Sequence, residues 1–509
     1  MTEQPSPDAI KTKGWLRRFL RRLDLHARRG DVIAGEVGED ARGVVIGKNI
    51  VQIGKLEIPL LPLLLLPLIL IGGFAAAFFA FRGPTRMEGS FNVAVAEFGQ
   101  EKPSGRVVSS GEGKLLSKWV YESLEAQKEI AKSTKDFADQ DITSSLEIWQ
   151  DSLPITEKGT RIGLVKNEAD VPGLAERLGA QVLIYGNIDP HGNFIPKYYV
   201  SPLVHSGTDQ ILGHYAAGDT PERVDPAALG FAKTKVTERT DPLLWLALGL
   251  QQEQFGFAEK ALKAFKQGAV QATGDPGEDI LHYFVGDAAL FLAQQGSGFN
   301  EKLASEAEDA FKQALRINPD SVRAHIGIGL VDLYRAYRGV HLEPEAAQPY
   351  LEKALQEHQL ALQLASKSNE TELKVLATLA LAQSNYLQGG AFYVAGKNAE
   401  AEAAFDQAIH LIESVSPDLN GLAEPRLAGL AYQTLGTAYK QKARMSAKDG
   451  DKVHSLEYYQ QAREAYSLCI EQGKAGVFDE ILTKTVIEGV CVPLDKESQQ
   501  AMQSLEGGQ

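Results

Sequence analysis

A spaced pattern of alanines and rings constrains the fold more than any other feature of this sequence. Residues 240–475 are rich in Ala, Leu, Gln, Glu and Lys, which favour helix. Within them an alanine is followed four residues later by a ring, and three residues after that by a small residue. The segments that carry this pattern are Ala261–Phe265–Gly268, Ala307–Phe311–Ala314, Ala354–His358–Ala361, Ala401–Phe405–Ala408 and Ala462–Tyr466–Cys469. Such spacing predicts a repeat protein built from helix pairs, because an unrelated helical bundle would not repeat it.

Matching positions in the preceding helices strengthen this prediction. Trp245, Leu248 and Gly249 come before the first copy, and Pro319 closes the second. Small residues let two helices approach closely, and a ring on the next turn fills the space between neighbouring pairs. Region 240–475 therefore resembles the tetratricopeptide repeat family. The residues that carry this resemblance are Trp245, Leu248, Gly249, Ala261, Phe265, Ala307, Phe311, Ala314, Pro319, Ala401, Phe405, Ala408, Tyr432, Leu435, Gly436 and Tyr439.

The resemblance implies an all-α solenoid whose first helices line a concave groove that binds proteins or peptides. The distance between the two half-patterns is stretched in the second, third and fifth copies. A count of roughly four to six repeats therefore stays open. Residues 476–509 are expected to cap the array and to fray at their end.

Residues 88–235 alternate between strand-like and helix-like segments. The segments 91–98, 144–150 and 161–167 are short and apolar, as buried strands are, and 113–131 has helical spacing. This order predicts a small α/β domain.

Two pieces of this region resemble a small periplasmic α/β domain that accompanies helical repeats in bacterial signalling and envelope proteins. They are the opening FNVAVAEF and the later LAERLGAQVLIYGNI. The matching positions are Leu178, Gly179, Ala180, Tyr185, Gly186 and Ile188. The resemblance brings no catalytic residues with it.

Residues 58–81 contain no charged side chain. At a rise of about 1.5 Å per residue, a helix of this length reaches about 36 Å, and a hydrocarbon core measures about 30 Å. Its distance from the N-terminus argues against a signal peptide, and its length argues against a buried core helix. An interfacial helix would need a polar face. We therefore predict one transmembrane helix, with the lipid bilayer as a partner.

Basic residues are concentrated before this segment, in residues 1–57. The positive-inside rule then predicts a single-pass protein of the inner cell membrane, with a cytoplasmic N-terminus and extracytoplasmic C-terminal domains. Residues 11–29 fit a basic helix lying on a membrane and a solvated helix equally well. Residues 30–55 are punctuated by glycine, which predicts short strands and turns. Gly47 and Lys48 lack the spacing of a phosphate loop.

No catalytic motif emerges from the titratable groups. The net charge of −14 disfavours nucleic acid as a partner. Cys469 and Cys491 lack zinc-type spacing and are expected to be ordinary buried residues, although one disulfide is open to them. Asp189, His191, His205 and His214 are of the residue types that bind metals, but they lack the spacing of a zinc-protease site. We expect no catalytic residue, cofactor or metal, and no enzyme activity.

These patterns predict a multidomain chain with one transmembrane helix, a small α/β domain and an all-α solenoid of the tetratricopeptide type. The predicted segments are 1–57, 58–81, 88–235, 240–475 and 476–509. The function that follows is a membrane-anchored scaffold or assembly factor that binds proteins or peptides, with a homo-oligomer left open. A membrane sensor whose α/β domain binds a small ligand, and an unrecognised enzyme in that domain, stay as alternatives.

Overall fold

The computed structural model describes most of the chain beyond residue 85 and three short segments before it. The described residues are 44–46, 50–53, 56–59, 86–133, 146–150, 162–204, 211–216, 222–223, 229–274, 277–295, 298–340, 343–368, 370–419, 422, 425–474 and 483–507. The chain forms two compact units, Met1–Arg82 and Gly83–Gln509. The basic stretch 11–29 lies outside the described residues.

The first unit contains a small antiparallel meander. Its strands are β1 (Val44–Ile46), β2 (Ile50–Ile53) and β3 (Leu56–Pro59), and β2 pairs with both neighbours. The glycine-punctuated stretch 30–55 was predicted to form short strands and turns, and β1 and β2 lie within it.

The segment predicted to cross a membrane requires a correction. Ile58 and Pro59, its first two residues, belong to β3, where they pair with Val51 and Ile50 of β2. Residues 60–81 lie outside the described residues. Across the described ranges, no helix combines the length and the apolar character that a membrane crossing needs. The transmembrane helix of the predicted fold class and the single-pass localisation are therefore wrong on this finding, and the predicted bilayer contact has no support from it.

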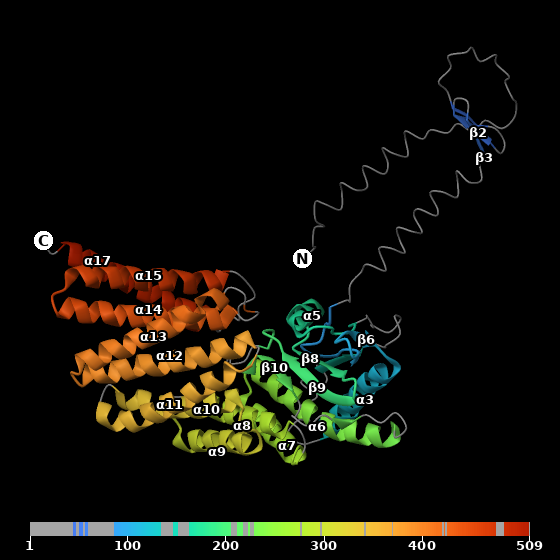
Figure 1. The fold of residues 1–509 in the computed structure, drawn as a ribbon, viewed down its shortest axis with the longest axis horizontal. Coiled ribbons are helices and arrows are strands. Elements are labelled where there is room, and N and C mark those ends of the chain that lie inside the picture. Colours follow the sequence, from blue (N-terminus) through green and yellow to red (C-terminus); the bar gives the residue numbers. More distant parts are fainter. Residues whose placement is uncertain are drawn as a thin grey trace, which may run out of the picture. The chain divides into compact units, whose positions relative to one another are not determined.

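The second unit begins with a mixed sheet (Figure 1). Its strands are β4 (Phe91–Val95), β5 (Gly99–Glu101), β6 (Val107–Ser109), β7 (Leu146–Gln150), β8 (Val182–Ile188), β9 (Asn193–Val200), β10 (Gly213–Ala216) and β11 (Glu222–Arg223). The main path runs β10-β9-β8-β4-β7. Strand β4 is parallel to β7 on one side and to β8 on the other, whereas β9 and β10 are antiparallel additions.

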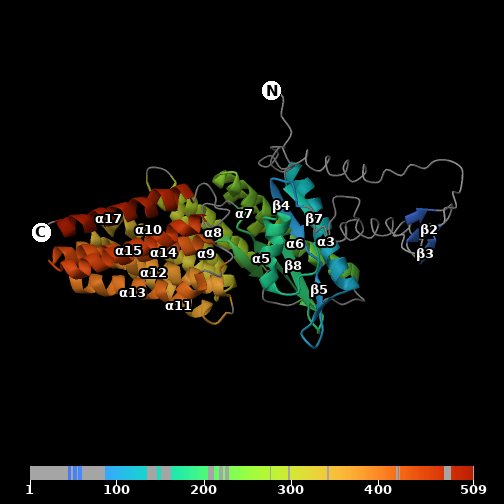
Figure 2. The same cartoon turned by 90° about the horizontal axis from the view of Figure 1, so that it is seen from above.

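Two helices cover opposite faces of this sheet (Figure 2). Helix α3 (Gly111–Ser133) packs on the face of Val93, and α5 (Val171–Leu178) packs on the face of Ala94. Successive residues of a strand point to opposite faces of the sheet, so the short strand β4 contributes side chains to the apolar layer on each face. The chain order β4, β7, β8 with β4 in the centre creates a point where the connections leave in opposite directions.

One predicted strand is absent from the described residues. Segment 161–167 contributes only an isolated bridge between Leu164 and Glu97. Gly163 has a φ of 89°, which lies in the left-handed region and interrupts extended backbone.

The rest of the second unit is a stack of long helices (Figure 1). They are α6 (Leu229–Gln254), α7 (Ala258–Gln271), α8 (Glu278–Gln294), α9 (Glu301–Ile317), α10 (Val322–Val340), α11 (Pro344–Ala365), α12 (Thr371–Val394), α13 (Asn398–Leu419), α14 (Pro425–Lys448), α15 (Lys452–Lys474), a π-helical segment η4 (Thr483–Cys491) and α17 (Val492–Gly507). The strongest packing joins α6 with α7, α8 with α9, α10 with α11, α12 with α13 and α14 with α15.

Contacts between the pairs show which helices lie on the inner side. The first helices of successive pairs contact one another along the series α8, α10, α12 and α14. The second helices of neighbouring pairs meet less extensively. The first helices therefore line the tighter, inner side of the stack, as in other solenoids of helix pairs.

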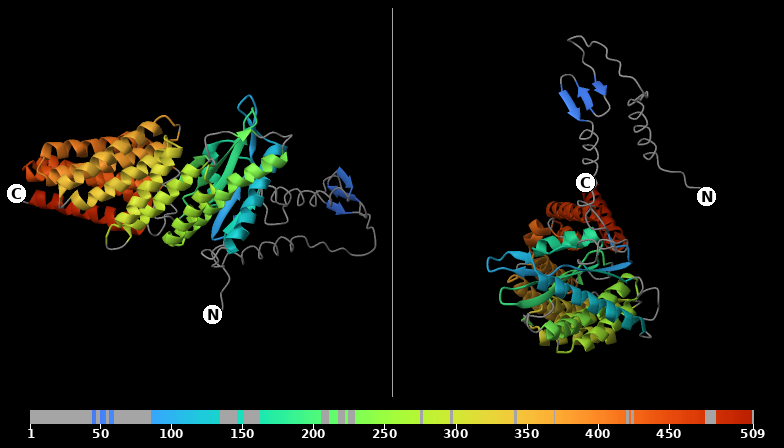
Figure 3. Two further views of the ribbon diagram at one scale, coloured as in Figure 1. Left: turned by 90° about the horizontal axis from the view of Figure 1, so that it is seen from below. Right: turned by 90° about the vertical axis from the view of Figure 1, so that its right-hand side faces the viewer.

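The sheet and the helices share one hydrophobic core (Figure 3). It runs from Phe91 and Trp119 beside the sheet, through Trp245, to the rings of the later pairs. The predicted boundary between 88–235 and 240–475 therefore falls inside one compact unit, and it stays a prediction.

Cys469 of α15 and Cys491 of η4 form a disulfide, and both are fully buried. The expectation of two ordinary, unpaired cysteines is wrong. The bond fixes the last helical segment to the final pair, and α17 packs on α15.

Candidate functional site

The residues of the repeat pattern lie between helices. A Cβ atom added to Gly249 would come within 2.1 Å of the Phe265 ring, and one on Gly436 within 2.6 Å of the Tyr466 ring. Phe311 is enclosed by glycines of two different helices, Gly286 and Gly327. These glycines are required by close approach, because no larger residue leaves room for the ring.

Most of the predicted signature residues occupy this packed interior. The buried members are Trp245, Leu248, Gly249, Ala261, Phe265, Ala307, Phe311, Ala314, Ala401, Phe405, Ala408, Tyr432, Leu435 and Gly436. Tyr439 is half-buried and donates its hydroxyl to Glu413 (2.6 Å), and Pro319 is exposed at the end of α9. A partner protein cannot reach the buried members, so recognition requires other side chains.

The third pair fills the ring position with an ionisable side chain. His358 is fully buried against Gly329. A carbonyl oxygen only accepts, so Nε2 carries the proton and donates to the Ile326 oxygen (3.2 Å), and Nδ1 lies 2.7 Å from the Ser384 hydroxyl, which donates to the Ala380 oxygen (3.2 Å). Burial lowers the pKa of His358 to about 4, because the charged ring would lose its hydration.

The inner side of the array is partly covered by the chain's own sheet. The Tyr215 ring of β10 packs against Phe284 of α8, with centroids 5.5 Å apart. Arg323 of α10 donates from Nη2 to the Leu212 oxygen (2.8 Å), and its guanidinium lies 4.7 Å from the Tyr215 centroid. Glu372 and Leu376 of α12 and Leu427 of α14 line a small cavity beside this contact. A partner entering this part of the groove would have to displace β10.

A cavity of about 450 Å³ opens instead at the turn edge of the last two pairs. It lies where α13 begins, α14 ends and α15 begins. We call it the turn-edge cavity, and its lining consists of Asn398, Ala399, Glu402, Lys442, Met445, Ser446, Asp449, Asp451, His454 and Tyr458.

Charge and aromatic contacts organise the turn-edge cavity. Lys442 forms an ion pair with Asp406 of α13, and its Nζ lies 4.7 Å from the Tyr458 ring centroid. Burial disfavours the charged form of Lys442, but the hydrogen bonds and charge interactions with Asp406 and Tyr458 together outweigh it, and the pKa of Lys442 is raised. The hydrogen bond between His454 and Asp451 (2.6 Å) raises the pKa of His454 and lowers that of Asp451. With Glu402 and Asp449 also in the wall, carboxylates outnumber cations.

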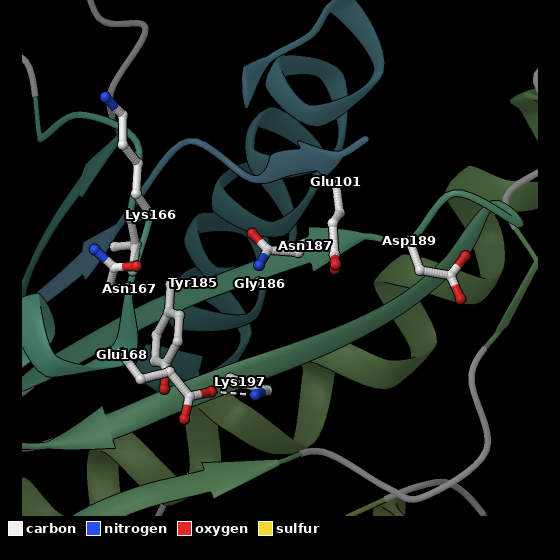
Figure 4. Close-up of a pocket in the computed structure, with 10 residues that line it drawn as sticks. Glu101, Lys166, Asn167, Glu168, Tyr185, Gly186, Asn187, Asp189 and Lys197 are labelled. Carbon is white, nitrogen blue, oxygen red and sulfur yellow. Dashed lines mark hydrogen bonds and ion pairs between the residues drawn. The ribbon is translucent and has the colours of Figure 1, made fainter. Parts of the chain in front are cut away.

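A second cavity, of about 240 Å³, lies on the sheet (Figure 4). We call it the sheet pocket, and its lining consists of Glu101, Val165, Lys166, Asn167, Glu168, Tyr185, Gly186, Asn187, Asp189 and Lys197. These residues come from the end of β5, the end of β8, the segment leading into α5, and β9. The pocket therefore lies at the carboxyl ends of the parallel strands, where the connections diverge.

Some side chains of the sheet pocket are already engaged. Lys197 forms an ion pair with Glu168, and the Tyr185 hydroxyl is hydrogen-bonded to His214 Nδ1 at 2.8 Å. Burial raises the pKa of Tyr185 and lowers that of His214, so both rings are neutral near neutral pH. Asp189 accepts from the His191 backbone N–H (2.8 Å).

The metal-ligand types noted in the sequence do not assemble into a site within the described ranges. No group of three or more His, Cys, Asp or Glu there could hold a metal ion. His214 is directed at Tyr185, Asp189 caps a turn at His191, and His205 lies outside the described residues. The sheet pocket was missed in the sequence because its walls come from separate segments.

Comparison with known proteins identifies similar solved structures only. No protein-family model matches the chain, and no curated protein does. One similar structure is that of MamA, with 18% identity, a TM-score of 0.26, and coverage of 45% of this chain and 96% of that one. Another is a thermophilic tetratricopeptide-repeat protein of Thermus thermophilus, with 17% identity, a TM-score of 0.27, and coverage of 46% and 98%.

A double mutant of MamA from RS-1 gives 19% identity, a TM-score of 0.24, and coverage of 47% and 97%. All three TM-scores lie below 0.5, so these likenesses carry no weight for function. The helical array resembles tetratricopeptide-repeat proteins.

Proposed function

We propose that this chain is a protein-interaction scaffold whose helical array binds a basic, extended segment of a partner protein at the turn-edge cavity. The observation that carries the proposal is a stack of helix pairs with an acidic cavity at its open edge. Solenoids of this kind present extended surfaces to partners. The proposal assigns no catalytic step to the chain.

The location follows from what the rest of the array already contacts. The ring and glycine positions are buried in the packing between helices, and β10 with the residues before it contacts α8 and α10 on the inner side. At the turn-edge cavity, Asp449 is exposed, Glu402 is exposed but lies 3.5 Å from Lys442, and the Tyr458 ring forms part of the wall beside the same lysine. A Lys or Arg side chain of a partner would meet carboxylates and stack over a ring, which are complementary contacts.

Selection from a library of displayed random peptides tests this proposal on the full chain. We expect the selected peptides to be enriched in Lys and Arg, and their affinity to fall as salt is added. The double variant Glu402→Lys/Asp449→Lys should weaken binding at least about tenfold, because it reverses the charge of the wall. Glu345→Lys, an exposed change on α11, is the matched control and should bind as the parent does.

Two results would overturn the proposal. One is selection of peptides without basic residues. The other is equal binding by the double variant and the Glu345→Lys control. Light scattering of the purified chain tests whether it forms a homo-oligomer. If the partner is a second copy of the chain, the measured mass should exceed that of a monomer and should fall in the double variant.

A further inference from the structure

The position of the sheet pocket is the first observation that points to a ligand. Strand β4 lies between β7 and β8, and the chain visits them in the order β4, β7, β8. In open parallel sheets, ligands bind outside the carboxyl ends of the strands, at the point where the connections diverge. Glu101, Lys166 and Asn187 bring three different segments to that point.

Unengaged polar groups are the second observation. Among the described residues, the side chains of Glu101, Lys166 and Asn187 form no hydrogen bond or ion pair with another side chain, whereas Lys197 and Glu168 neutralise each other. Figure 4 shows Asn187 and Glu101 next to each other, and Lys166 across the pocket from Glu101 with its ammonium directed outward at the rim. The pocket therefore offers one ammonium, one carboxylate and one amide to a ligand.

The charge pattern excludes simpler ligands. A phosphate at this position usually rests on the start of a helix. Here Asp170 stands at the N-cap of α5 and its carboxylate repels an anion, whereas Glu168 is paired with Lys197. Lys166, which forms no ion pair among the described residues, would repel a purely cationic ligand. A cavity of about 240 Å³ lies below the range of about 300–1,000 Å³ for drug-sized ligands, so the ligand is small.

We propose that the sheet pocket binds a small zwitterion, an amino acid or short peptide with free termini. Its ammonium group pairs with Glu101 and the Asn187 oxygen, and its carboxylate pairs with Lys166. The buried Tyr185 ring forms the floor under its carbon skeleton. Each terminal group thus meets an opposite charge that no other described side chain satisfies.

Calorimetric titration of the full chain tests this proposal. The probes are alanine, leucine, glutamate, lysine and dialanine, followed by the N-acetyl and the methyl ester derivatives of whichever probe binds. We expect at least one zwitterion to bind, and each blocked derivative to bind at least about tenfold more weakly, because a hydrogen-bonded charge is lost. Inorganic phosphate is a separate probe and should not bind.

Variants locate the ligand within the pocket. Glu101→Gln and Lys166→Met should each lower the affinity at least about tenfold. Lys367→Met, at an exposed position beyond α11, is the matched control and should leave it unchanged. Thermal melting of each variant confirms that it folds, since Lys166 is exposed and Glu101 is half-exposed.

Four results would overturn the proposal. They are no binding of any zwitterion, equal binding of the N-acetyl derivative, binding of phosphate, and parent-like affinity in both Glu101→Gln and Lys166→Met. None of them depends on the turn-edge cavity, so this proposal and the scaffold function fail separately.

Discussion

The two ends of the helical array are covered in different ways. At its beginning, α3 packs on α6 and β10 packs on α8, through a continuous apolar core that includes the Tyr215 and Phe284 rings. At its end, α15 is joined to η4 by the disulfide Cys469–Cys491, and to α17 by the ion pair between Arg463 and Asp495. One cover is a folded sheet, and the other is a short covalently fixed segment.

This difference indicates which end should unfold cooperatively with the rest of the array. A solenoid needs a cover at each end because a terminal repeat leaves one apolar face without a neighbour. The sheet contributes many buried side chains to the core, so it should unfold together with the array. The second cover contributes only a few, Ile487 and Cys491 among them, besides its covalent bond and ion pairs, so it should open on its own. We therefore expect changes at the first end to be global and changes at the second end to be local.

The largest expected effect is at the first end, in Tyr215→Ala. The Tyr215 ring is buried, stacks on Tyr198 at a centroid distance of 5.1 Å, and packs on α8. Its removal should lower the free energy of unfolding by about 3–5 kcal/mol, measured by urea denaturation. Tyr215→Phe removes only the hydrogen bond to the Ile211 oxygen (2.7 Å) and should cost about 1 kcal/mol. Equal costs for the two variants would mean that the sheet does not stabilise the array.

The next effect is at the second end, in Cys469→Ala/Cys491→Ala. The bond closes a loop with a sequence separation of 22, and opening a loop of that size should cost about 3 kcal/mol. Hydrogen exchange should report the loss of protection in η4 and α17 and leave β4 and β8 unchanged. A parallel loss of protection in the sheet would break the comparison between the ends.

The repeat region was predictable because its sequence pattern is also its contact pattern. Gly249 and Phe265, like Gly436 and Tyr466, lie on the two helices of one pair and pack against each other in the structure. One further contact was not apparent from the sequence, because the loops between these helices are longer. Phe311 meets Gly327 of the following pair as well as Gly286 of its own.

Features that depend on three-dimensional position were not predictable. An uncharged run does not specify its backbone, and Ile58 and Pro59 join a strand. Two cysteines far apart in the sequence give no Cα–Cα distance, which is 6.5 Å here. Both cavities draw their walls from separate segments, so neither could be found from spacing alone.

A smaller effect is expected between the two ends, at His358. Its pKa is lowered to about 4 in the folded chain, against 6.5 for an ordinary histidine. The unfolded chain therefore gains a proton first, and stability that is full above pH 6.5 is lost as the pH falls towards 4. Between pH 7.5 and 5 the loss from this group should be about 2 kcal/mol.

His358→Phe should remove that part of the pH dependence, because rings without a titratable group, such as Phe311 and Phe405, fill the same position in other pairs. Urea denaturation of both proteins at the two pH values measures the difference. An identical pH dependence would show that His358 is not the group that titrates. If acid acts locally at His358, protection in the sheet should outlast that of α11 and α12.

The smallest expected effect is at the ion pair that helps to hold the second cover. Arg463 Nε and Asp495 Oδ1 are 2.9 Å apart, and both side chains are partly exposed, at 32% and 26%. Solvent and salt screen such pairs, so a double-mutant cycle with Arg463→Gln and Asp495→Asn should give a coupling energy below about 1 kcal/mol. A much larger value would mean that α17 is held by charge as firmly as the sheet is held by its core. The two ends would then differ in chemistry but not in cooperativity.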